Sequence, residues 1–493
     1  MATFTPSKYQ KCVYTYILQG KGNAVIDAVA GSGKSTTIVN ALKLIPTNKQ
    51  VLFLAFNKSI VEELKIKIGN LSNVEVRTLH SLGCKALMKA FKSEVDENKY
   101  TAWLNNGIAS KFITPSRELT DELIGIWKTN IAKLIDLGRV NLVVNADSLD
   151  DLAYKHDIAL VDNEIEVALR GIRWGESETA VIDYTDMVYL PVVKRLHMYQ
   201  FDWVFIDECQ DLNAAQRNLF LMCIKKGGRF VAVGDPRQAI YGFAGADVES
   251  FNLLKKVPHT VKLPLSVCYR CDSDIIALAK GIVPQIEARD NAPAGVVSRE
   301  SVIADVKDGD MVLCRVTAPL VSLCMRYISQ GVKAYVKGRD IGKNLINMIK
   351  KTNKKTMPEV MEKLERELGR IIGKVVAKTK CTEQEAKESE MYRSYQDKLQ
   401  VIDILSEGLT DANEVMDRID MIFSDDSKNG ICLSTVHKSK GLESDRVFIL
   451  CEDKFYLKAC MRVDWMAEQE RNLVYVAYTR AKHFLGFIQD FKA

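Results

Sequence analysis

A glycine-rich turn between a strand and a helix is the feature of this sequence that most restricts its fold. Residues 25–35 read VIDAVAGSGKS, an apolar run that leads into the turn. The residues after it carry apolar side chains at helical spacing, at Ile38, Leu42 and Ile45. A strand, a glycine turn and a helix in this order place backbone N–H groups and a helix N-terminus around a phosphate. The chain is therefore expected to be an α/β protein that binds a nucleoside triphosphate.

Each residue type in the turn suits one part of a triphosphate. Gly31 and Gly33 let backbone N–H groups converge on the β-phosphate without a Cβ in the way, and Lys34 reaches the β and γ oxygens. Ser35 offers its hydroxyl to Mg²⁺. Ala28 stands where the general pattern has its first glycine. A glycine turn without a ligand is the alternative, and the strand and helix on either side disfavour it.

Length and composition set the general class of the protein. The 493 residues suffice for about three or four domains, and 47% hydrophobic residues suffice for packed cores. The first ten residues, MATFTPSKYQ, lack the apolar stretch of a secretory signal, and the sequence contains no run of about 18 apolar residues. We expect a soluble cytoplasmic protein with no membrane contact, either associated with a nucleoid or encoded by a virus in its host cell.

The net charge and the cysteines give little further information about the function of the protein. A net charge of +5 is compatible with a polyanionic partner. The 12 cysteines are scattered without a disulfide framework, as in a reducing compartment. Cys268 and Cys271 have CxxC spacing, but no nearby second pair completes a zinc set, so we interpret the spacing as chance.

Strand-like and helix-like segments alternate along the chain, which predicts parallel sheets. Strands are expected near 51–55, 74–77, 204–207, 230–233, 311–316, 333–336, 431–435, 447–450 and 485–488. Two stretches with helical spacing of apolar residues interrupt this alternation. The predicted domains are a first sheet domain, 1–90 and 196–283, with a helical insertion, 91–195, and a second sheet domain, 284–342 and 429–493, with a small helical accessory insertion, 343–428. The basic start of the accessory insertion, KKTNKKT, is interpreted as a solvated loop rather than a phosphate contact.

Two adjacent acidic residues follow one of the predicted strands. The sequence Phe205-Ile206-Asp207-Glu208 puts both carboxylates at the carboxyl end of a buried strand, where a triphosphate site needs them. Asp207 is expected to hold Mg²⁺ through its waters, and Glu208 to orient and deprotonate the attacking water. Acidic residues also end many strands at the surface, but the glycine turn favours the catalytic interpretation.

A third strand end carries an amide and two rings. In residues 231–247, VAVGDPRQAIYGFAGAD, Gln238 is placed to sense a γ-phosphate. Tyr241 and Phe243 follow, flanked by glycines that would expose them. Exposed rings of this kind suit base stacking, which contributes about 1–3 kcal/mol per base, whereas an isolated pair of rings would more often belong to a core.

The ordered motifs resemble those of superfamily 1 DNA helicases of the UvrD/Rep/PcrA group over nearly the whole chain. The matching segments are AGSGKS at 30–35, LAFNKS at 54–59, TLHS at 78–81, DECQD at 207–211, GDPRQAIYGFAGA at 234–246, CYRC at 268–271, STVHKSKGLE at 434–443 and ERNLVYVAYTRA at 470–481. The resemblance implies two RecA-like P-loop parallel-sheet domains, each interrupted by a mainly helical insertion, and ATP and Mg²⁺ as ligands.

The resemblance also implies roles for single residues. The residues implied for ATP are Gln10, Tyr269 and Thr36 near the adenine, Glu443 at the ribose, Ala30, Gly31, Ser32, Gly33, Lys34 and Ser35 around the phosphates, and Gln238, Arg270 and Arg480 at the γ-phosphate. Arg270 and Arg480 would act as arginine fingers, whose removal can lower rates by about 10³–10⁵-fold. Asp207 and Ser35 would hold the metal. The residues implied for DNA are Phe56, Asn57, Thr78, His80, Tyr241, Phe243, Thr435 and His437.

Some positions depart from close relatives. Thr36 replaces a frequent arginine near the adenine, Phe243 replaces a tryptophan but keeps a ring, and Ala244 removes a cationic contact. The accessory insertion is shorter than in the long bacterial members, and the chain stops soon after the last motif. Base selectivity is therefore expected to be looser, and unwinding strength and protein partners are the features least defined by the resemblance.

The function expected from the sequence is an ATP-dependent DNA helicase and translocase that acts as a monomer on single-stranded DNA and on single/double-strand junctions. The resemblance implies 3′ to 5′ movement and partners in replication or repair. The short accessory insertion motivates an alternative, a translocase that strips proteins from DNA with little unwinding. A DNA-binding scaffold with a dead ATPase is disfavoured by Lys34, Asp207 and Glu208, and a fused nuclease by the lack of a further domain.

Overall fold

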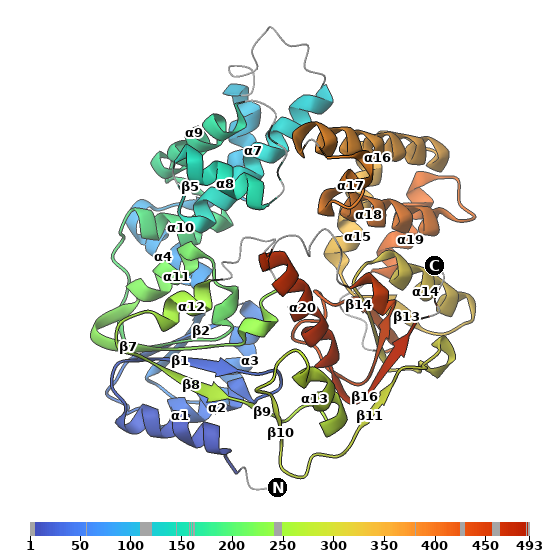
Figure 1. Cartoon of the computed structure of the whole chain (residues 1–493). Coiled ribbons are helices and arrows are strands. Elements are labelled where there is room, and N and C mark those ends of the chain that lie inside the picture. Colours follow the sequence, from blue (N-terminus) through green and yellow to red (C-terminus); the bar gives the residue numbers. More distant parts are fainter. Residues whose placement is uncertain are drawn as a thin grey trace. The chain divides into compact units, whose positions relative to one another are not determined.

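A computed structural model describes residues 5–55, 57–108, 121–143, 145–156, 158, 160, 163–240, 249–379, 381–423, 429–455, 464–489 and 491 (Figure 1). The chain divides into two compact units, Met1–Ser266 and Val267–Ala493. Each unit contains a six-stranded sheet in which all pairings are parallel. The fold class predicted from the sequence, two RecA-like parallel-sheet domains with mainly helical insertions, is confirmed.

The sheet of the first unit has the strand order β3-β2-β6-β7-β1-β8. Its strands are β1 (Asn23–Ala28), β2 (Val51–Ala55), β3 (Val74–Thr78), β6 (Phe201–Ile206), β7 (Ile224–Gly234) and β8 (Thr260–Leu265). The neighbouring helices are α1 (Lys8–Gln19), α2 (Lys34–Leu42), α3 (Lys58–Ile68), α4 (Leu79–Phe91), α11 (Ala214–Met222) and α12 (Ser250–Lys255). Because the strands are parallel, the segments that follow β1, β6 and β7 meet at one edge of the sheet.

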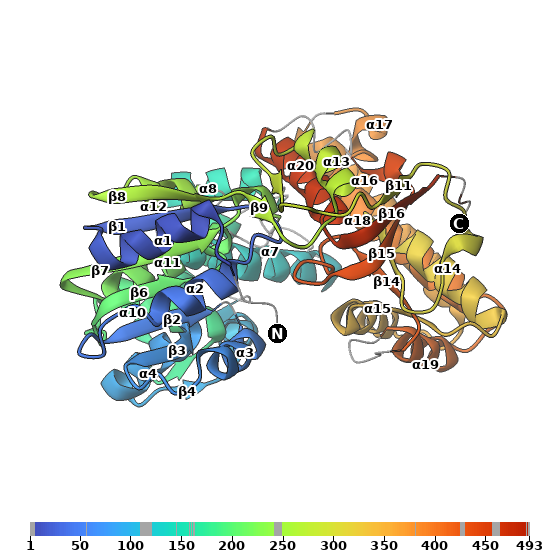
Figure 2. The ribbon, with the colours of Figure 1, turned by 90° about the horizontal axis from the view of Figure 1, so that it is seen from below.

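Both faces of this sheet are covered, because the strand side chains alternate between two cores. Phe53 of β2 packs in the core that α1, α2 and α3 cover, whereas its neighbours Leu52 and Leu54 pack in the core beneath α4, α11 and α12. Figure 2 shows these helices on either side of the strands. Packing on both faces therefore fixes the position of the sheet edge at which the strands end.

A helical segment of the first unit lies between β3 and β6 in sequence. It comprises α5 (Lys99–Trp103), a π-helical turn (Leu104–Ile108), α7 (Asp121–Asn141), α8 (Ala146–Lys155), α9 (Glu164–Ser177) and α10 (Tyr184–Val193), with a two-stranded pair of β4 (Glu94–Val95) and β5 (Val181–Ile182). The apolar positions predicted from the spacing, Trp103, Leu104, Trp127, Ile131 and Leu134, are buried in its core. α10 packs against α4 and α11, which joins this segment to the helices beside the sheet.

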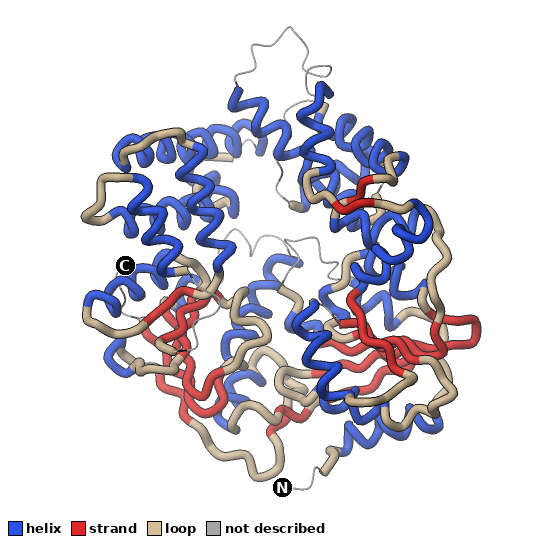
Figure 3. Tube along the Cα trace, turned by 180° about the vertical axis from the view of Figure 1, so that it is seen from behind, coloured by secondary structure: helices blue, strands red, loops and turns tan. Residues whose placement is uncertain are grey.

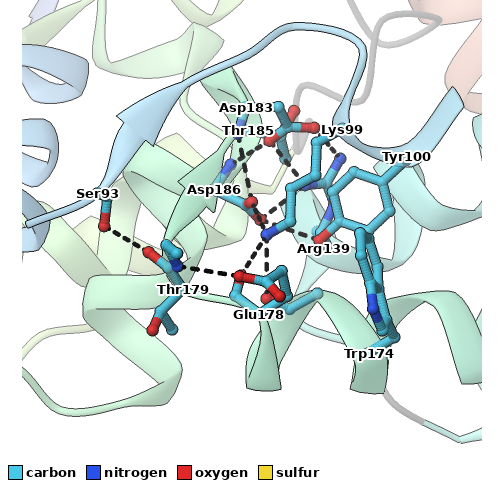
Figure 4. Close-up of polar contacts among 12 residues, drawn as sticks. Ser93, Lys99, Tyr100, Arg139, Trp174, Glu178, Thr179, Asp183, Thr185 and Asp186 are labelled. Carbon is cyan, nitrogen blue, oxygen red and sulfur yellow. Dashed lines mark hydrogen bonds and ion pairs between the residues drawn. The ribbon is translucent and has the colours of Figure 1, made fainter. Parts of the chain in front are cut away.

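A buried cluster of charges connects four helices of this segment (Figure 4). Arg139 of α7 donates two hydrogen bonds of 2.8 Å to the carboxylate of Asp183, and one of 2.8 Å to Asp186 of α10. Lys99 of α5 lies 2.7 Å from the other oxygen of Asp186 and also donates to the carbonyl of Gly175 in α9. Opposite charges therefore satisfy one another where water is excluded.

The sheet of the second unit has the strand order β11-β16-β15-β12-β14-β13. Its strands are β11 (Val296–Ser298), β12 (Met311–Cys314), β13 (Ala334–Val336), β14 (Ile431–Thr435), β15 (Ser444–Leu450) and β16 (Ala481–Ile488), and a separate pair consists of β9 (Val267–Cys268) and β10 (Glu287–Ala288). Figure 3 separates these strands from the helices by colour. The helices are α13 (Ser273–Lys280), α14 (Ala318–Ser329), α15 (Arg339–Lys351), α16 (Met357–Thr379), α17 (Glu383–Ala386), α18 (Glu390–Ser406), α19 (Ala412–Ile422) and α20 (Asp464–Tyr478).

Helices α15, α16, α18 and α19 share one core with this sheet. Leu364 and Ile402 of the accessory helices pack in the same cluster as Val312 and Leu433 of the strands. At the other end of the unit, α13 contacts β11, β16 and α20, so residues 273–280 belong to the second unit. The finer four-part division expected from the sequence stays a prediction. Among the described residues, no helix has the length and apolar character needed to cross a membrane.

Candidate nucleotide-binding site

The glycine turn follows β1 as the sequence predicts. β1 ends at Ala28 and α2 begins at Lys34. Gly31 and Gly33 have φ of 64° and 74°, in the left-handed region that a side chain disfavours. No side chain caps α2 at its N-terminus. The first-turn N–H groups of α2 therefore point out of a turn whose shape suits a bound phosphate.

Lys34 and the acidic pair from β6 lie together at this turn. The ammonium of Lys34 is 2.7 Å from Oε1 of Glu208. Burial alone would lower the pKa of Lys34, but the carboxylates of Glu208, Asp207 and Asp235 outweigh it and the pKa is raised. Burial, together with the charge of Glu208, raises the pKa of Asp207 to about 6. The site thus holds more buried negative charge than Lys34 balances.

This excess of carboxylates fits a divalent cation. Asp207 is buried and its pKa is raised despite the charge of Lys34, so an ionised Asp207 needs added positive charge, whereas Asp235 already lies beside the guanidinium of Arg237. Carboxylate and hydroxyl oxygens are ligands that Mg²⁺ accepts, together with phosphate oxygens and water. Asp207 and Ser35 are the residues that would hold it.

Residues after β7 complete the site from a third strand end. Asp235 directly follows β7 and is fully buried. Its Oδ2 accepts a 2.7 Å hydrogen bond from Nε2 of Gln238, and its Oδ1 lies 2.9 Å from Nε of Arg237. The guanidinium of Arg237 also reaches Asp27 of β1, at 2.9 Å. These contacts fix the turn that carries Gln238.

Three polar residues of this region were not assigned roles by the sequence analysis. Gln210 bonds to Glu208 and to the backbone of Asp235, while Asp235 and Arg237 fix the Gln238 turn. All three stand within the DECQD and GDPRQ segments. Their place directly after predicted buried strands was the signal that could have identified them.

Gln10, the residue implied for the adenine, is buried beside α2. Its Nε2 donates to Oγ1 of Thr37 at 2.9 Å, and its Oε1 accepts from the N–H of Ser7 in a capping box. The side chain is therefore oriented by two neighbours, one of them on the phosphate-binding helix.

The second unit brings together Arg270 and Glu443, which lie far apart in the sequence. Nε of Arg270 donates to Oε2 of Glu443 at 2.7 Å, and its Nη1 donates to the carbonyl of Thr479 at 3.1 Å. Burial tends to raise the pKa of Glu443, but Arg270 and Lys482 outweigh it and the pKa is lowered. Tyr269, beside Arg270, is partly exposed.

Arg480, the second predicted arginine finger, is buried within its own unit. Its Nε donates to the carbonyl of Val476 and its Nη1 to the carbonyl of Leu442, both at 3.0 Å. In this structure the Arg480 guanidinium is thus engaged with carbonyl groups, one in α20 and one in the segment before Glu443.

The residues predicted to contact DNA occupy strand ends in both units. Asn57 follows β2, and its side chain caps α3. Thr78 ends β3, and its side chain caps α4. In the second unit, Thr435 ends β14 and its Oγ1 accepts a hydrogen bond from the N–H of Lys438. Burial lowers the pKa of His80. Burial and the cations Arg315, Lys438 and Lys440 lower the pKa of His437 to about 3, so this ring is neutral.

Phe56, Tyr241 and Phe243, also predicted to contact DNA, lie outside the described residues. Within the described part of the chain, no three His, Cys, Asp or Glu side chains gather as a metal-ion cluster.

Two family models match the chain. The model of the UvrD/REP helicase N-terminal domain matches residues 13–259, and that of the UvrD-like helicase C-terminal domain matches residues 430–488. The matched ranges contain the glycine turn and Glu208 in the first unit, and Glu443 and Arg480 in the second.

Similar full-length proteins carry related names. F-box DNA helicase protein 1 of Schizosaccharomyces pombe is 23% identical over 93% of this chain and 54% of its own length. ATP-dependent DNA helicase Rep is 24% identical in both Buchnera aphidicola and Escherichia coli, over 53% of this chain and 43% and 41% of the two Rep proteins. The chain thus spans about half the length of these relatives or less.

Proposed function

Because this chain belongs to the UvrD/REP helicase family, we propose that it is an ATP-dependent DNA helicase and translocase. The proposed enzyme moves along single-stranded DNA from 3′ to 5′, and couples ATP hydrolysis between its two RecA-like units to strand separation. Single-stranded DNA and single/double-strand junctions are its proposed substrates, and it acts as a monomer. Relatives named DNA helicase support the substrate class.

The observation that carries the proposal is the position of Lys34 and Glu208. A phosphate-binding turn, an ammonium group and an acidic pair of a buried Asp207 and a partly exposed Glu208 meet at one sheet edge, with Lys34 and Glu208 2.7 Å apart. Phosphoryl transfer needs positioning and electrostatic stabilisation rather than covalent chemistry, and these groups supply both.

We assign the steps in the first unit as follows. Lys34 exchanges its partner Glu208 for the β and γ oxygens of ATP, and this exchange leaves Glu208 as the general base. Glu208 then orients and deprotonates the attacking water, while Gln238 contacts the γ-phosphate. Asp207 and Ser35 hold Mg²⁺, which when bound neutralises charge on the phosphate oxygens.

The second unit contributes the remaining nucleotide contacts in this proposal. Tyr269 stacks on the adenine, Glu443 contacts the ribose, and Arg270 and Arg480 stabilise the charge that develops during phosphoryl transfer. In this proposal the carbonyl groups of Val476 and Leu442, which accept from Nε and Nη1, orient the Arg480 guanidinium. Asn57, Thr78, His80, Thr435 and His437, together with Phe56, Tyr241 and Phe243, contact the DNA strand.

A second candidate function is a translocase that displaces bound proteins with little duplex unwinding. The small size of the accessory region supports it, because helices α15, α16, α18 and α19 form part of the core of the second unit rather than a large separate domain.

Strand-displacement assays distinguish the two candidates and test direction. Matched duplexes with a 3′ or a 5′ single-stranded tail are incubated with enzyme and ATP, and Lys34→Ala serves as the blank. Unwinding of the 3′-tailed duplex alone supports the main proposal, and unwinding of the 5′-tailed duplex alone contradicts its direction. Displacement of streptavidin from a biotinylated single strand without duplex opening favours the second candidate.

A further inference from the structure

The side-chain amide of Gln210 lies between two strand ends of the first unit. Gln210 belongs to the short 3₁₀ turn Cys209–Asp211 after β6 and is 1% exposed. Its Nε2 donates to Oε2 of Glu208 at 2.6 Å, and its Oε1 accepts from the backbone N–H of Asp235 at 3.0 Å. One side chain therefore joins the segment after β6 to the segment after β7.

The two oxygens of the Glu208 carboxylate have different donors. Lys34 lies 2.7 Å from Oε1, and Gln210 donates to Oε2. In the proposed reaction Lys34 moves to the phosphates, whereas Gln210 has no such second task. Gln210 can therefore keep the carboxylate in place at the moment when the carboxylate has to act on water.

The contact with Asp235 extends this connection to Gln238. Asp235 is fully buried and accepts from Nε2 of Gln238 at 2.7 Å. Hydrogen bonds thus lead from the proposed general base, through Gln210 and Asp235, to the proposed γ-phosphate sensor.

The backbone is shaped around the Gln210 amide. A Cβ at position 234 would lie 2.4 Å from Oε1 of Gln210 and 2.9 Å from Sγ of Cys209, so a larger residue there would displace the Gln210 amide. Glu208 has φ of 51° and ψ of 41°, a left-handed conformation that is unusual for a residue other than glycine. This sharp turn precedes Gln210, whose side chain reaches back to the Glu208 carboxylate.

We propose that Gln210 is a positioning residue for ATP hydrolysis, which holds the Glu208 carboxylate and links it to the turn that carries Gln238. This inference rests on the proposed function, since it assumes that Glu208 acts as the base. Gln210 acts through Glu208 and does not itself touch the reacting atoms.

Two substitutions test it. Gln210→Leu removes the hydrogen bonds to Glu208 and Asp235, together with a 3.3 Å bond from Nε2 to the carboxylate of Asp211. Gln210→Glu keeps an acceptor for Asp235 but sets an oxygen against the carboxylates of Glu208 and Asp211. Both should lower kcat for ATP hydrolysis in the presence of single-stranded DNA at least about tenfold, because a misplaced base loses much of its effect. KM for ATP should change less than about threefold, since the phosphate-binding turn and Lys34 remain.

A matched control separates positioning from stability. Gln216, in α11, caps that helix reciprocally with Asn213 and is outside the nucleotide site. Gln216→Leu should lower the melting temperature but leave kcat within about twofold of the wild type. A decrease in kcat equal to that of the Gln210 variants would overturn the inference.

A double-mutant cycle tests whether Gln210 acts through Glu208. In the Glu208→Gln background, Gln210→Leu should change the residual kcat less than about twofold, measured with radiolabelled ATP. A full additive loss would contradict a shared role.

Failure of the inference and failure of the proposed function are distinguishable. If the wild type shows no hydrolysis that DNA stimulates, the proposed function fails. If the wild type is stimulated and Gln210→Glu, folded by circular dichroism, keeps kcat within about twofold, the Gln210 inference alone is overturned.

Discussion

Replacing Arg139 by methionine should destabilise the first unit strongly. Arg139, Lys99 and Asp186 have side chains that are 1%, 1% and 0% exposed, and their charges are balanced by one another, by Asp183, which is 12% exposed, and by Asp136, which is 59% exposed and lies 2.5 Å from Arg139. Methionine removes one of the two fully buried cations of the cluster, so Asp183 and Asp186 both lose their guanidinium partner, and Lys99 remains as the cation paired with Asp186 (Figure 4). Leaving a buried charge without its partner costs about 3–5 kcal/mol, so we expect the free energy of unfolding to fall by that amount at pH 7.5.

The decrease in the free energy of unfolding caused by Arg139→Met, called the penalty below, should depend on pH. A carboxylate without its cation has a folded-state pKa above its unfolded value of about 3.9, and the folded variant therefore takes up a proton as the pH falls. Stability is then lost as pH rises through the raised pKa, so the penalty should be smaller at pH 5 than at pH 7.5 by about 1 kcal/mol or more.

Urea unfolding followed by tryptophan fluorescence measures this directly. Three of the five tryptophans, Trp103, Trp127 and Trp174, lie in or against the core of this helical segment. Arg170→Met is the control, because the Arg170 pair with Glu166 on α9 is exposed and contributes less than about 0.5 kcal/mol. A loss below about 1 kcal/mol for Arg139→Met, or a penalty that does not change with pH, would refute the reasoning.

Three further predictions concern function and pH. Glu208→Gln should lower kcat for ATP hydrolysis by about 10²-fold or more while single-stranded DNA binding, measured by fluorescence anisotropy, persists; full hydrolysis would contradict its role as base. In the folded chain, burial and the neighbouring cations Arg315, Lys438 and Lys440 lower the pKa of His437 to about 3, so the ring is neutral. In the unfolded chain His437 takes up a proton near pH 6.5. The free energy of unfolding should therefore decrease as the pH falls below about 6.5. Between pH 7.5 and 5.5 this loss is at most about 1.4 kcal/mol, and His437→Asn should reduce the pH dependence of urea unfolding by that amount; an unchanged dependence would argue against a neutral ring. The logarithm of the affinity for single-stranded DNA should fall linearly with the logarithm of the salt concentration, with a slope of about −0.7 per phosphate contact. A flat titration would exclude a groove that follows the phosphate backbone.

Much of the fold follows from local sequence patterns. The predicted strands at 51–55 and 431–435 coincide with β2 and β14, because both are short, mainly apolar runs buried in parallel sheets. β8 was not predicted, since Thr260–Leu265 is an edge strand that contains Lys262 and Pro264 and has several exposed side chains. β11 was also not predicted, because its three residues are too few to show a period.

The long-range polar contacts could not be predicted from the sequence patterns. The spacing of apolar residues predicted the helical segment, but not the meeting of Lys99, Arg139 and Asp186, which are up to 87 residues apart. In the same way, the motifs predicted Lys34, Glu208 and Gln238 as a group, while the link through Gln210 became visible only when β6 and β7 were placed side by side. Register and side-chain direction, which set such contacts, are tertiary properties.

ATP hydrolysis measured with and without a single-stranded oligonucleotide, in the wild type and in Lys34→Ala, tests the central claim most directly. We expect strong stimulation by the oligonucleotide in the wild type and none in Lys34→Ala, because Lys34 is the cation of the phosphate-binding turn. Equal hydrolysis with and without the oligonucleotide, or full hydrolysis in Lys34→Ala, would contradict a DNA-driven motor that uses this site.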